Sequence, residues 1–287
     1  MHDNLTATLH HFGLSAAPDQ LPGGSQPTFR VGQAVLKRVK ETSLENNHSP
    51  QLIQWIAEFT PRLAMHGFRL PQPIATTDGR WITDEGWTAW HFVAGQHATA
   101  QEIPQCIAGI IAFHQALRAI PKHPLMDDSR TPWGKAHQWC WGALPTAVQP
   151  QLQPLIQALA ALRQPIQTSP PQLIHGDLNP ENILIAPGLP PAFLDFSPFW
   201  APAEFALAIF ANWIGPRRGD EAALAHFAHL PNFNQLLVRA ALRMLLVMVV
   251  IDHLDGWESS SEKRAAEIVV AYVSRHAEHT GAEAREV

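Results

Sequence analysis

The sequence predicts an α+β fold of two lobes, in which a small antiparallel sheet is followed by a larger, mainly helical part. Before about Phe92, short runs rich in β-branched and aromatic residues alternate with turn residues, as in strands joined by tight turns. Beyond Phe92, apolar residues recur at helical spacing over long segments. We therefore predict an N-terminal lobe over residues 1–92 and a C-terminal lobe over residues 93–287.

Composition and charge limit the class of protein. The chain of 287 residues is 46% hydrophobic, which is enough for two lobes with a substantial core. Its net charge of −5 does not suggest a nucleic-acid partner, and Cys106 and Cys140 are too few for a disulfide framework. No signal sequence is evident, and the longest apolar run, Met244 to Ile251, is shorter than the roughly 20 residues of a membrane helix. We expect a soluble, cytoplasmic protein without a membrane partner; the oligomeric state stays open.

The N-terminal elements begin with residues spaced as on a short helix, namely Leu5, Leu9 and Phe12. Strands are expected over residues 28–31 and 34–37, because the two residues between them, Gly32 and Gln33, suit a hairpin turn. A helix is expected from Ser49-Pro50, a cap followed by proline in the first turn, to Gly67. Further strands are expected over residues 68–74, 80–83 and 87–93.

The C-terminal elements are expected to be mainly helices. Thr99 to Glu102 is a capping box, and helical spacing continues after it to Pro121. His114 lies in that apolar stripe, which favours a hydrogen-bonded core histidine over a catalytic one. The Trp-rich stretch from Pro121 to Pro150 is expected to be irregular, and it either packs against the lobe or forms the wall of a small-molecule site. Other helices are expected over residues 152–162, 203–214, 236–254 and from 259 onward. Residues 198–202 are expected to form a rigid apolar loop.

One stretch of the C-terminal lobe gathers polar residues around a hairpin. Residues 183–185 and 192–194 have the composition of short strands and are joined by a turn rich in Pro and Gly. Asn182 precedes the first strand and Asp195 follows the second, so the hairpin brings both to one edge. Two oxygen donors at one edge suit a magnesium ion, which completes its coordination with water and phosphate. Asp177 lies on the loop before Asn182, where a carboxylate can orient a substrate hydroxyl and accept its proton during phosphoryl transfer.

The chain resembles one known family through two short motifs, His175-Gly176-Asp177-Leu178-x-x-x-Asn182 and Leu194-Asp195-Phe196. These are similar to the catalytic signature of the aminoglycoside phosphotransferase and choline kinase-like family, which has the protein-kinase-like fold. The resemblance is strong in this stretch and loose elsewhere, as in a divergent member. It implies that Asp177 is the catalytic base and that Asn182 and Asp195 hold magnesium. The implied reaction transfers the γ-phosphoryl group of ATP, or of GTP, to a hydroxyl group of a small molecule such as an aminoglycoside, a sugar or an amino alcohol.

The same resemblance implies a nucleotide site in the N-terminal lobe. Gly23, Gly24 and Ser25 precede the first hairpin and match the loop that covers the nucleotide. Lys37 ends the second strand of that hairpin and matches the lysine that binds the phosphates. The alternative for Lys37 is a solvated residue at a strand end.

Two further positions follow from the family pattern. Glu58 is the acid expected to hold Lys37 toward the phosphates, with Glu45 as the alternative. The backbone of His91 and Val93 matches the hinge that hydrogen-bonds the nucleobase. Packing of a hydrophobic strand explains the same hinge residues equally well.

Two residues depart from the family pattern. Ser197 stands where a Gly often follows Asp-Phe, and a positive φ there would be costly for a serine. Ala206 stands where an Asp usually braces the catalytic loop through backbone N–H groups, and Glu204 is a candidate substitute. Without a brace the loop would be less firmly preorganised. The second hypothesis is therefore a nucleotide-binding regulatory pseudoenzyme with little or no catalysis.

Overall fold

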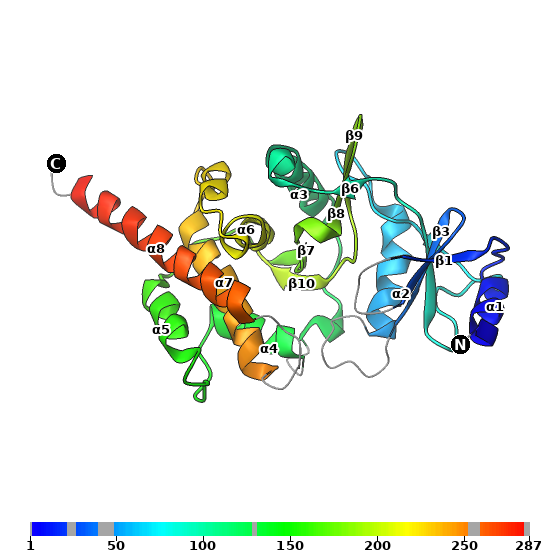
Figure 1. The fold of residues 1–287 in the computed structure, drawn as a ribbon, viewed down its shortest axis with the longest axis horizontal. Coiled ribbons are helices and arrows are strands. Elements are labelled where there is room, and N and C mark those ends of the chain that lie inside the picture. The colour runs from blue at the N-terminus through cyan, green and yellow to red at the C-terminus, as the bar shows by residue number, and fades with distance from the viewer. Residues whose placement is uncertain (1, 22–26, 40–48, 128–130, 252–258, 284–287) are drawn as a thin grey trace.

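The computed structural model describes residues 2–21, 27–39, 49–127, 131–251 and 259–283 of the chain. Helix α1 (His2–His11) and the N-terminal strands lie at one end of the molecule, and helix α8 (Ser259–Glu283) lies at the other (Figure 1). Short strands and helix α3 (Ile103–Leu117) lie between them. This arrangement confirms the predicted α+β fold class, whereas the lobe boundary at Phe92 stays a prediction.

The N-terminal strands form one five-stranded antiparallel sheet. Its order is β1 (Pro18–Leu21), β2 (Thr28–Val31), β3 (Ala34–Arg38), β5 (Trp87–His91) and β4 (Pro73–Ile74). The predicted hairpin is present, because Val31 pairs with Ala34 and Gly32 adopts a φ of 60° in the two-residue turn. Side chains alternate across β3, so Leu36 is buried while Lys37 lies on the opposite face.

Two helices flank this sheet. Helix α1 and the residue that follows it bring Leu5 and Phe12 onto Leu36 and Trp87, which closes a small separate core on one face. Helix α2 (Pro50–Phe59) begins as predicted, because the Ser49 hydroxyl accepts the Leu52 N–H at 3.2 Å. It ends at Phe59 in a 3₁₀ turn and is therefore shorter than the predicted helix.

The large core of the protein surrounds helix α7 (Phe233–Val250). Four helices contact it: α4 (Pro132–Trp141), α5 (Gln153–Leu162), α6 (Ala203–Ile214) and α8. Helix α7 is long and apolar enough to cross a membrane by length and composition alone, but 72% of it is buried inside the protein. This burial agrees with the core helix that the sequence predicts.

The predicted hairpin of the polar stretch is formed by β8 (Ile183–Ala186) and β9 (Leu189–Phe193), with Ile183 paired to Phe193. Strand β6 (Gln96–His97) adds to β8. The strand before the polar loop, β7 (Gln172–His175), pairs with β10 (Pro198–Ala201), and His175 lies opposite Pro198. The loop of Asp177 connects β7 to β8, and the turn of Asp195 connects β9 to β10. Both segments therefore join the β7–β10 pair to the β8–β9 hairpin.

Some predicted elements are wrong. Residues 80–83 form no strand, because Thr76 and Thr83 use local backbone and side-chain hydrogen bonds around turns at Gly79 and Gly86, both with positive φ. Residues 198–201 form a strand rather than a loop. The Trp-rich stretch contains helix α4, whose start the Thr131 cap and the following proline indicate. Its buried Ala136 and Cys140 show that this stretch packs against the lobe.

Candidate active site

The polar loop starts at His175, the last residue of β7, which is anchored in the core. Its backbone N–H donates to His114 Nε2 at 3.1 Å, and His114 Nδ1 donates to the Ile110 carbonyl at 2.7 Å. Burial lowers the pKa of His114 to about 4, so the ring is neutral and Nε2 accepts. His114 is therefore the hydrogen-bonded core histidine that the sequence predicts.

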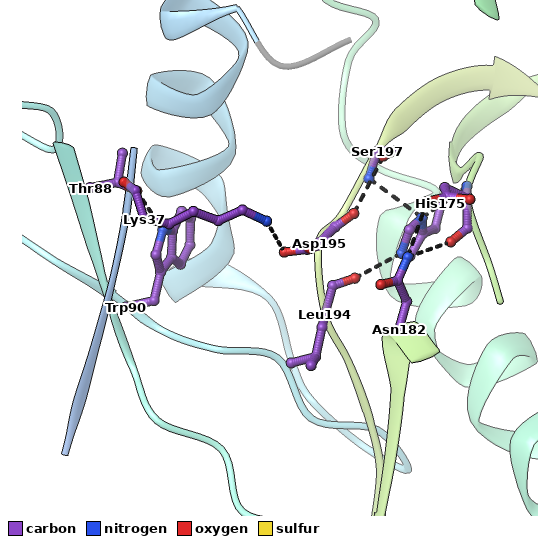
Figure 2. A network of polar contacts seen from close by, with 9 residues as sticks. Lys37, Thr88, Trp90, His175, Asn182, Leu194, Asp195 and Ser197 are labelled. Carbon is purple, nitrogen blue, oxygen red and sulfur yellow. Dashed lines mark hydrogen bonds and ion pairs between the residues drawn. The ribbon is translucent and has the colours of Figure 1, made fainter. Parts of the chain in front are cut away.

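The ring of His175 joins the two halves of the site. Its Nδ1 accepts the backbone N–H of Asp177 at 3.2 Å and that of Ser197 at 3.4 Å. Its Nε2 donates to the Leu194 carbonyl at 3.0 Å (Figure 2). This pattern assigns a neutral ring with the proton on Nε2. A single imidazole thus ties the loop of Asp177 to the segment that carries Asp195.

Gly176 is clamped between two elements. A Cβ at this position would lie 2.0 Å from the Phe199 ring, so glycine is required. The Gly176 N–H donates to the Ser197 carbonyl at 2.8 Å, and its own carbonyl accepts from Arg243 Nη1 at 2.8 Å. Both backbone polar groups of Gly176 are therefore satisfied.

The carboxylate of Asp177 is oriented by two amide side chains. Asn182 Nδ2 donates to Oδ2 at 3.1 Å and to the Asp177 carbonyl at 2.9 Å. Asn179 Nδ2 donates to Oδ1 at 3.3 Å, and its own oxygen accepts the Asn182 N–H at 3.0 Å. Sequence reasoning missed Asn179, although Asn followed by Pro is a recognisable cap for the short turn Pro180–Asn182. The loop therefore holds its acid in one orientation.

Asn182 and Asp195 come together as the hairpin predicts. The Leu194 N–H donates to the Asn182 carbonyl at 2.8 Å, which places the next residue, Asp195, beside Asn182. Because the Asn182 nitrogen is engaged with Asp177, its side-chain oxygen remains as a ligand. An amide oxygen and a carboxylate fit magnesium, and no cluster of three or more His, Cys, Asp or Glu side chains suited to a metal occurs in the described ranges. The donor chemistry therefore fits a site completed by phosphate and water.

The backbone of this turn differs from expectation. The left-handed conformation falls on Asp195, with φ of 47°, and not on Ser197. Ser197 is buried, and its hydroxyl donates to the Asp195 carbonyl at 3.4 Å. The serine therefore fits the turn without the cost of a positive φ, which Asp tolerates better than most residues.

Lys37 reaches the site from the sheet. Its Nζ lies 2.6 Å from Asp195 Oδ1, and Figure 2 shows the side chain extending from β3 toward the turn. The side chains of Lys37 and Asp195 are 32% and 47% exposed, so the pair is screened by solvent. Such a pair contributes at most about 1 kcal/mol, which makes it exchangeable for a phosphate.

The expected partner of Lys37 is elsewhere. Glu58 lies on the exposed face of α2 and accepts a hydrogen bond from Gln54 Nε2 at 3.0 Å. No ion pair between Lys37 and Glu58 is formed, because the helix buries the opposite face, which carries Leu52, Ile56 and Phe59. The alternative acid, Glu45, lies outside the described residues.

The structure describes only some of the other residues expected at the nucleotide site. Gly23, Gly24 and Ser25 lie outside the described residues. The backbone N–H of His91 donates to the Gln72 carbonyl at 2.7 Å, so it is not available to a nucleobase. The N–H of Val93 makes no backbone hydrogen bond within the described part of the chain. Of the two hinge residues, only Val93 keeps a backbone donor for the base.

Among the described residues, helix α6 carries no acid that contacts the loop of Asp177. Ala206 is fully buried and carries no polar side chain, and Glu204 accepts the Ser169 hydroxyl at 2.6 Å instead of contacting the loop. The loop contact comes from Arg243 of α7, which sequence reasoning missed. Its one signal is an arginine flanked by apolar residues, Leu242 and Met244, in the core helix. Burial lowers the pKa of Arg243, while electrostatic interactions with Cys140 and Asp177 act to raise it.

A cavity of about 110 Å³ adjoins the site. The Phe199 ring that covers Gly176 also lines this cavity, together with His137 and Trp200. Lys122 lies over the Trp200 ring, with Nζ 6.0 Å from its centroid. Aromatic rings and one cation would suit part of a small organic molecule.

The chain has a protein-kinase-like fold. Its antiparallel sheet carries Lys37, and the mainly helical part carries Asp177, Asn182 and Asp195. The chain belongs to the phosphotransferase enzyme family, whose sequence profile matches residues 20–243. No curated protein gives a significant sequence match to the chain.

Solved structures share this fold at low sequence identity. The amicoumacin kinase hAmiN, in complex with AMP-PNP, Ca²⁺ and Ami, is 14% identical with a TM-score of 0.61, covering 94% of this chain and 93% of that one. The aminoglycoside phosphotransferase APH(4)-Ia is 15% identical with a TM-score of 0.60, covering 93% and 98%. A choline/ethanolamine kinase family protein from Mesorhizobium loti is 16% identical with a TM-score of 0.59, covering 95% and 98%. At these identities the likeness concerns the fold alone.

Proposed function

We propose that the protein is a magnesium-dependent small-molecule kinase, which moves the γ-phosphoryl group of ATP or GTP to a hydroxyl group of its acceptor. One observation carries the proposal. Asn179 and Asn182 orient the Asp177 carboxylate next to the two candidate metal ligands, Asn182 and Asp195. Lys37 contacts Asp195 from the N-terminal sheet. A base, a pair of metal ligands and a phosphate-binding cation are the parts that phosphoryl transfer requires.

Each residue has a defined part in the proposed reaction. The Asp177 carboxylate accepts the proton of the acceptor hydroxyl while the new oxygen–phosphorus bond forms and the bond to the nucleoside diphosphate breaks. Asn179 and Asn182 fix the orientation of that carboxylate, which is where much of the rate enhancement in such reactions arises. Lys37 leaves Asp195 and pairs with the phosphates. Asn182 and Asp195 would hold magnesium, which neutralises the charge of the phosphate oxygens when bound.

Membership of the family indicates a broad class of acceptor. Amicoumacin kinase and aminoglycoside phosphotransferases are among the proteins of similar fold, as is a member of the choline/ethanolamine kinase family. We therefore propose an acceptor that is an antibiotic, a sugar or an amino alcohol. The cavity beside Phe199 and Trp200 is our candidate for its binding site.

A second function, nucleotide binding without catalysis, is favoured by two observations. Ala206 stands where the family usually has an acid, and the Lys37–Glu58 ion pair is absent from the described part of the chain. Against it stand the ordered contacts of Asp177. The two functions differ in turnover, since both include binding of the magnesium nucleotide.

A phosphotransfer screen tests the proposal. Purified protein is incubated with ATP or GTP, magnesium and acceptors of the three classes, and release of nucleoside diphosphate is measured beside the Asp195→Ala variant. We expect acceptor-dependent release that the variant lacks. Magnesium-dependent nucleotide binding without release on any acceptor would favour the non-catalytic function.

A further inference from the structure

Helix α7 places a buried arginine beneath the catalytic loop. Arg243 is only 2% exposed and lies in the middle of a helix whose neighbouring residues are apolar and buried. Arginine stays protonated in proteins, so this position holds a buried positive charge. Burial of a charge is unfavourable unless its surroundings compensate for the lost water. The contacts of Arg243 are therefore informative about its role.

Those contacts lead to the loop and not to a structural ion pair. Arg243 Nη1 donates to the Gly176 carbonyl at 2.8 Å. Its guanidinium carbon lies 4.4 Å from the Phe199 ring centroid and 5.2 Å from that of Trp133. Among the described residues no carboxylate lies within ion-pair distance of Arg243, and its Nε is buried without a hydrogen-bond partner.

The clamp at Gly176 is sterically coupled to the same ring. Phe199 lies so close to Gly176 that a Cβ would contact the ring at 2.0 Å, and the cation lies over that ring. The Ser197 carbonyl holds the Gly176 N–H while Arg243 holds the Gly176 carbonyl. The two backbone polar groups of Gly176, the residue before Asp177, are therefore held by different elements.

We propose that Arg243 is the positioning residue of the catalytic loop, acting through the Gly176 carbonyl where the usual acid on helix α6 is replaced by Ala206. The hydrogen bond runs in the opposite direction to the usual one, in which an acid accepts from backbone N–H groups. Here the Arg243 side chain donates to the Gly176 carbonyl, and the N–H of Asp177 donates to His175. The inference rests on the proposed function, because it concerns the orientation of Asp177 for phosphoryl transfer.

One helical turn away lies a matched control. Arg239 is also buried, at 5% exposed, and its guanidinium carbon lies 5.1 Å from the Trp141 ring centroid. It donates to the Gln235 and Gln164 carbonyls at 2.9 and 2.8 Å, and neither residue belongs to the catalytic loop. Substitution of either arginine removes a buried cation from the same helix, but only Arg243 contacts Gly176.

The test compares Arg243→Met with Arg239→Met. We expect Arg243→Met to lose about 100-fold in kcat, the loss typical of a small displacement of a catalytic group, while nucleotide KM changes about twofold or less. Arg239→Met should keep kcat within about twofold. Arg243→Lys, which keeps a donor and a charge, should recover at least about tenfold over the methionine variant. If Arg243→Met does not fold, Arg243→Lys is compared with Arg239→Lys.

Hydrogen exchange separates this inference from the proposed function. Amides of residues 176–179, 181 and 182 should exchange at least about tenfold faster in Arg243→Met than in wild type or Arg239→Met. If the wild type has no turnover but this local change occurs, the brace exists and the proposed function fails. Unchanged kcat and unchanged exchange in Arg243→Met, or equal losses in both methionine variants, would overturn the inference.

Discussion

The buried His114 and the half-buried His137 should make the protein sensitive to mild acid. His114 and His137 are at most partly accessible in the native state, and burial lowers their pKa values to about 4 and about 3. In the unfolded chain both return to about 6.5, so the unfolded state binds more protons as the pH falls below that value. Stability is therefore full above pH 6.5 and is lost progressively below it.

The expected loss follows from the linkage relation. At pH 5 each histidine should lower the free energy of unfolding by about 2 kcal/mol relative to pH 8, or about 4 kcal/mol for both. Urea unfolding monitored by circular dichroism at the two pH values measures this difference. In His114→Gln the loss should shrink by about 2 kcal/mol, since the variant has no group to protonate there. A variant with the full wild-type loss would refute the assignment of His114.

Three further predictions concern the site itself. Lys37→Ala should raise the KM for the nucleotide at least about tenfold, as steady-state kinetics would show, because a phosphate-binding cation is lost; an unchanged KM would contradict that role. Gly176→Ala should lower the free energy of unfolding by about 1–3 kcal/mol, measured by urea titration, since its Cβ overlaps the Phe199 ring, and wild-type stability would show that the ring moves freely. Asn179→Ala should reduce kcat more than nucleotide KM, because it releases one Asp177 oxygen; a change in KM alone would place Asn179 in nucleotide binding.

Local sequence signals predicted the parts of the fold that local chemistry determines. The two-residue turn at Gly32-Gln33 fixes the hairpin of β2 and β3, and the Ser49 and Thr99 caps fix the starts of their helices. The Asn182 and Asp195 pair was predictable for the same reason, because a short hairpin has one register. Propensity failed at residues 198–201, whose pairing with β7 is a tertiary contact.

Side-chain partnerships across the fold were not predictable in this way. Glu58 was chosen as the acid of its helix, but its orientation depends on which face of α2 the core buries. Arg243 lies 67 residues beyond Gly176 in the chain, and no local pattern indicates its contact with the loop. The sequence predicted which polar groups gather at the candidate site better than the side chains that hold them in place.

The most direct measurement is the rate of phosphotransfer by Asp177→Asn, in parallel with wild type, on an acceptor found in the screen. The asparagine keeps the size of the side chain but cannot accept the proton of the hydroxyl. We expect kcat to fall by about 10²–10⁴ while the magnesium nucleotide still binds. Full phosphotransfer by the variant would contradict the assignment of Asp177 as the base.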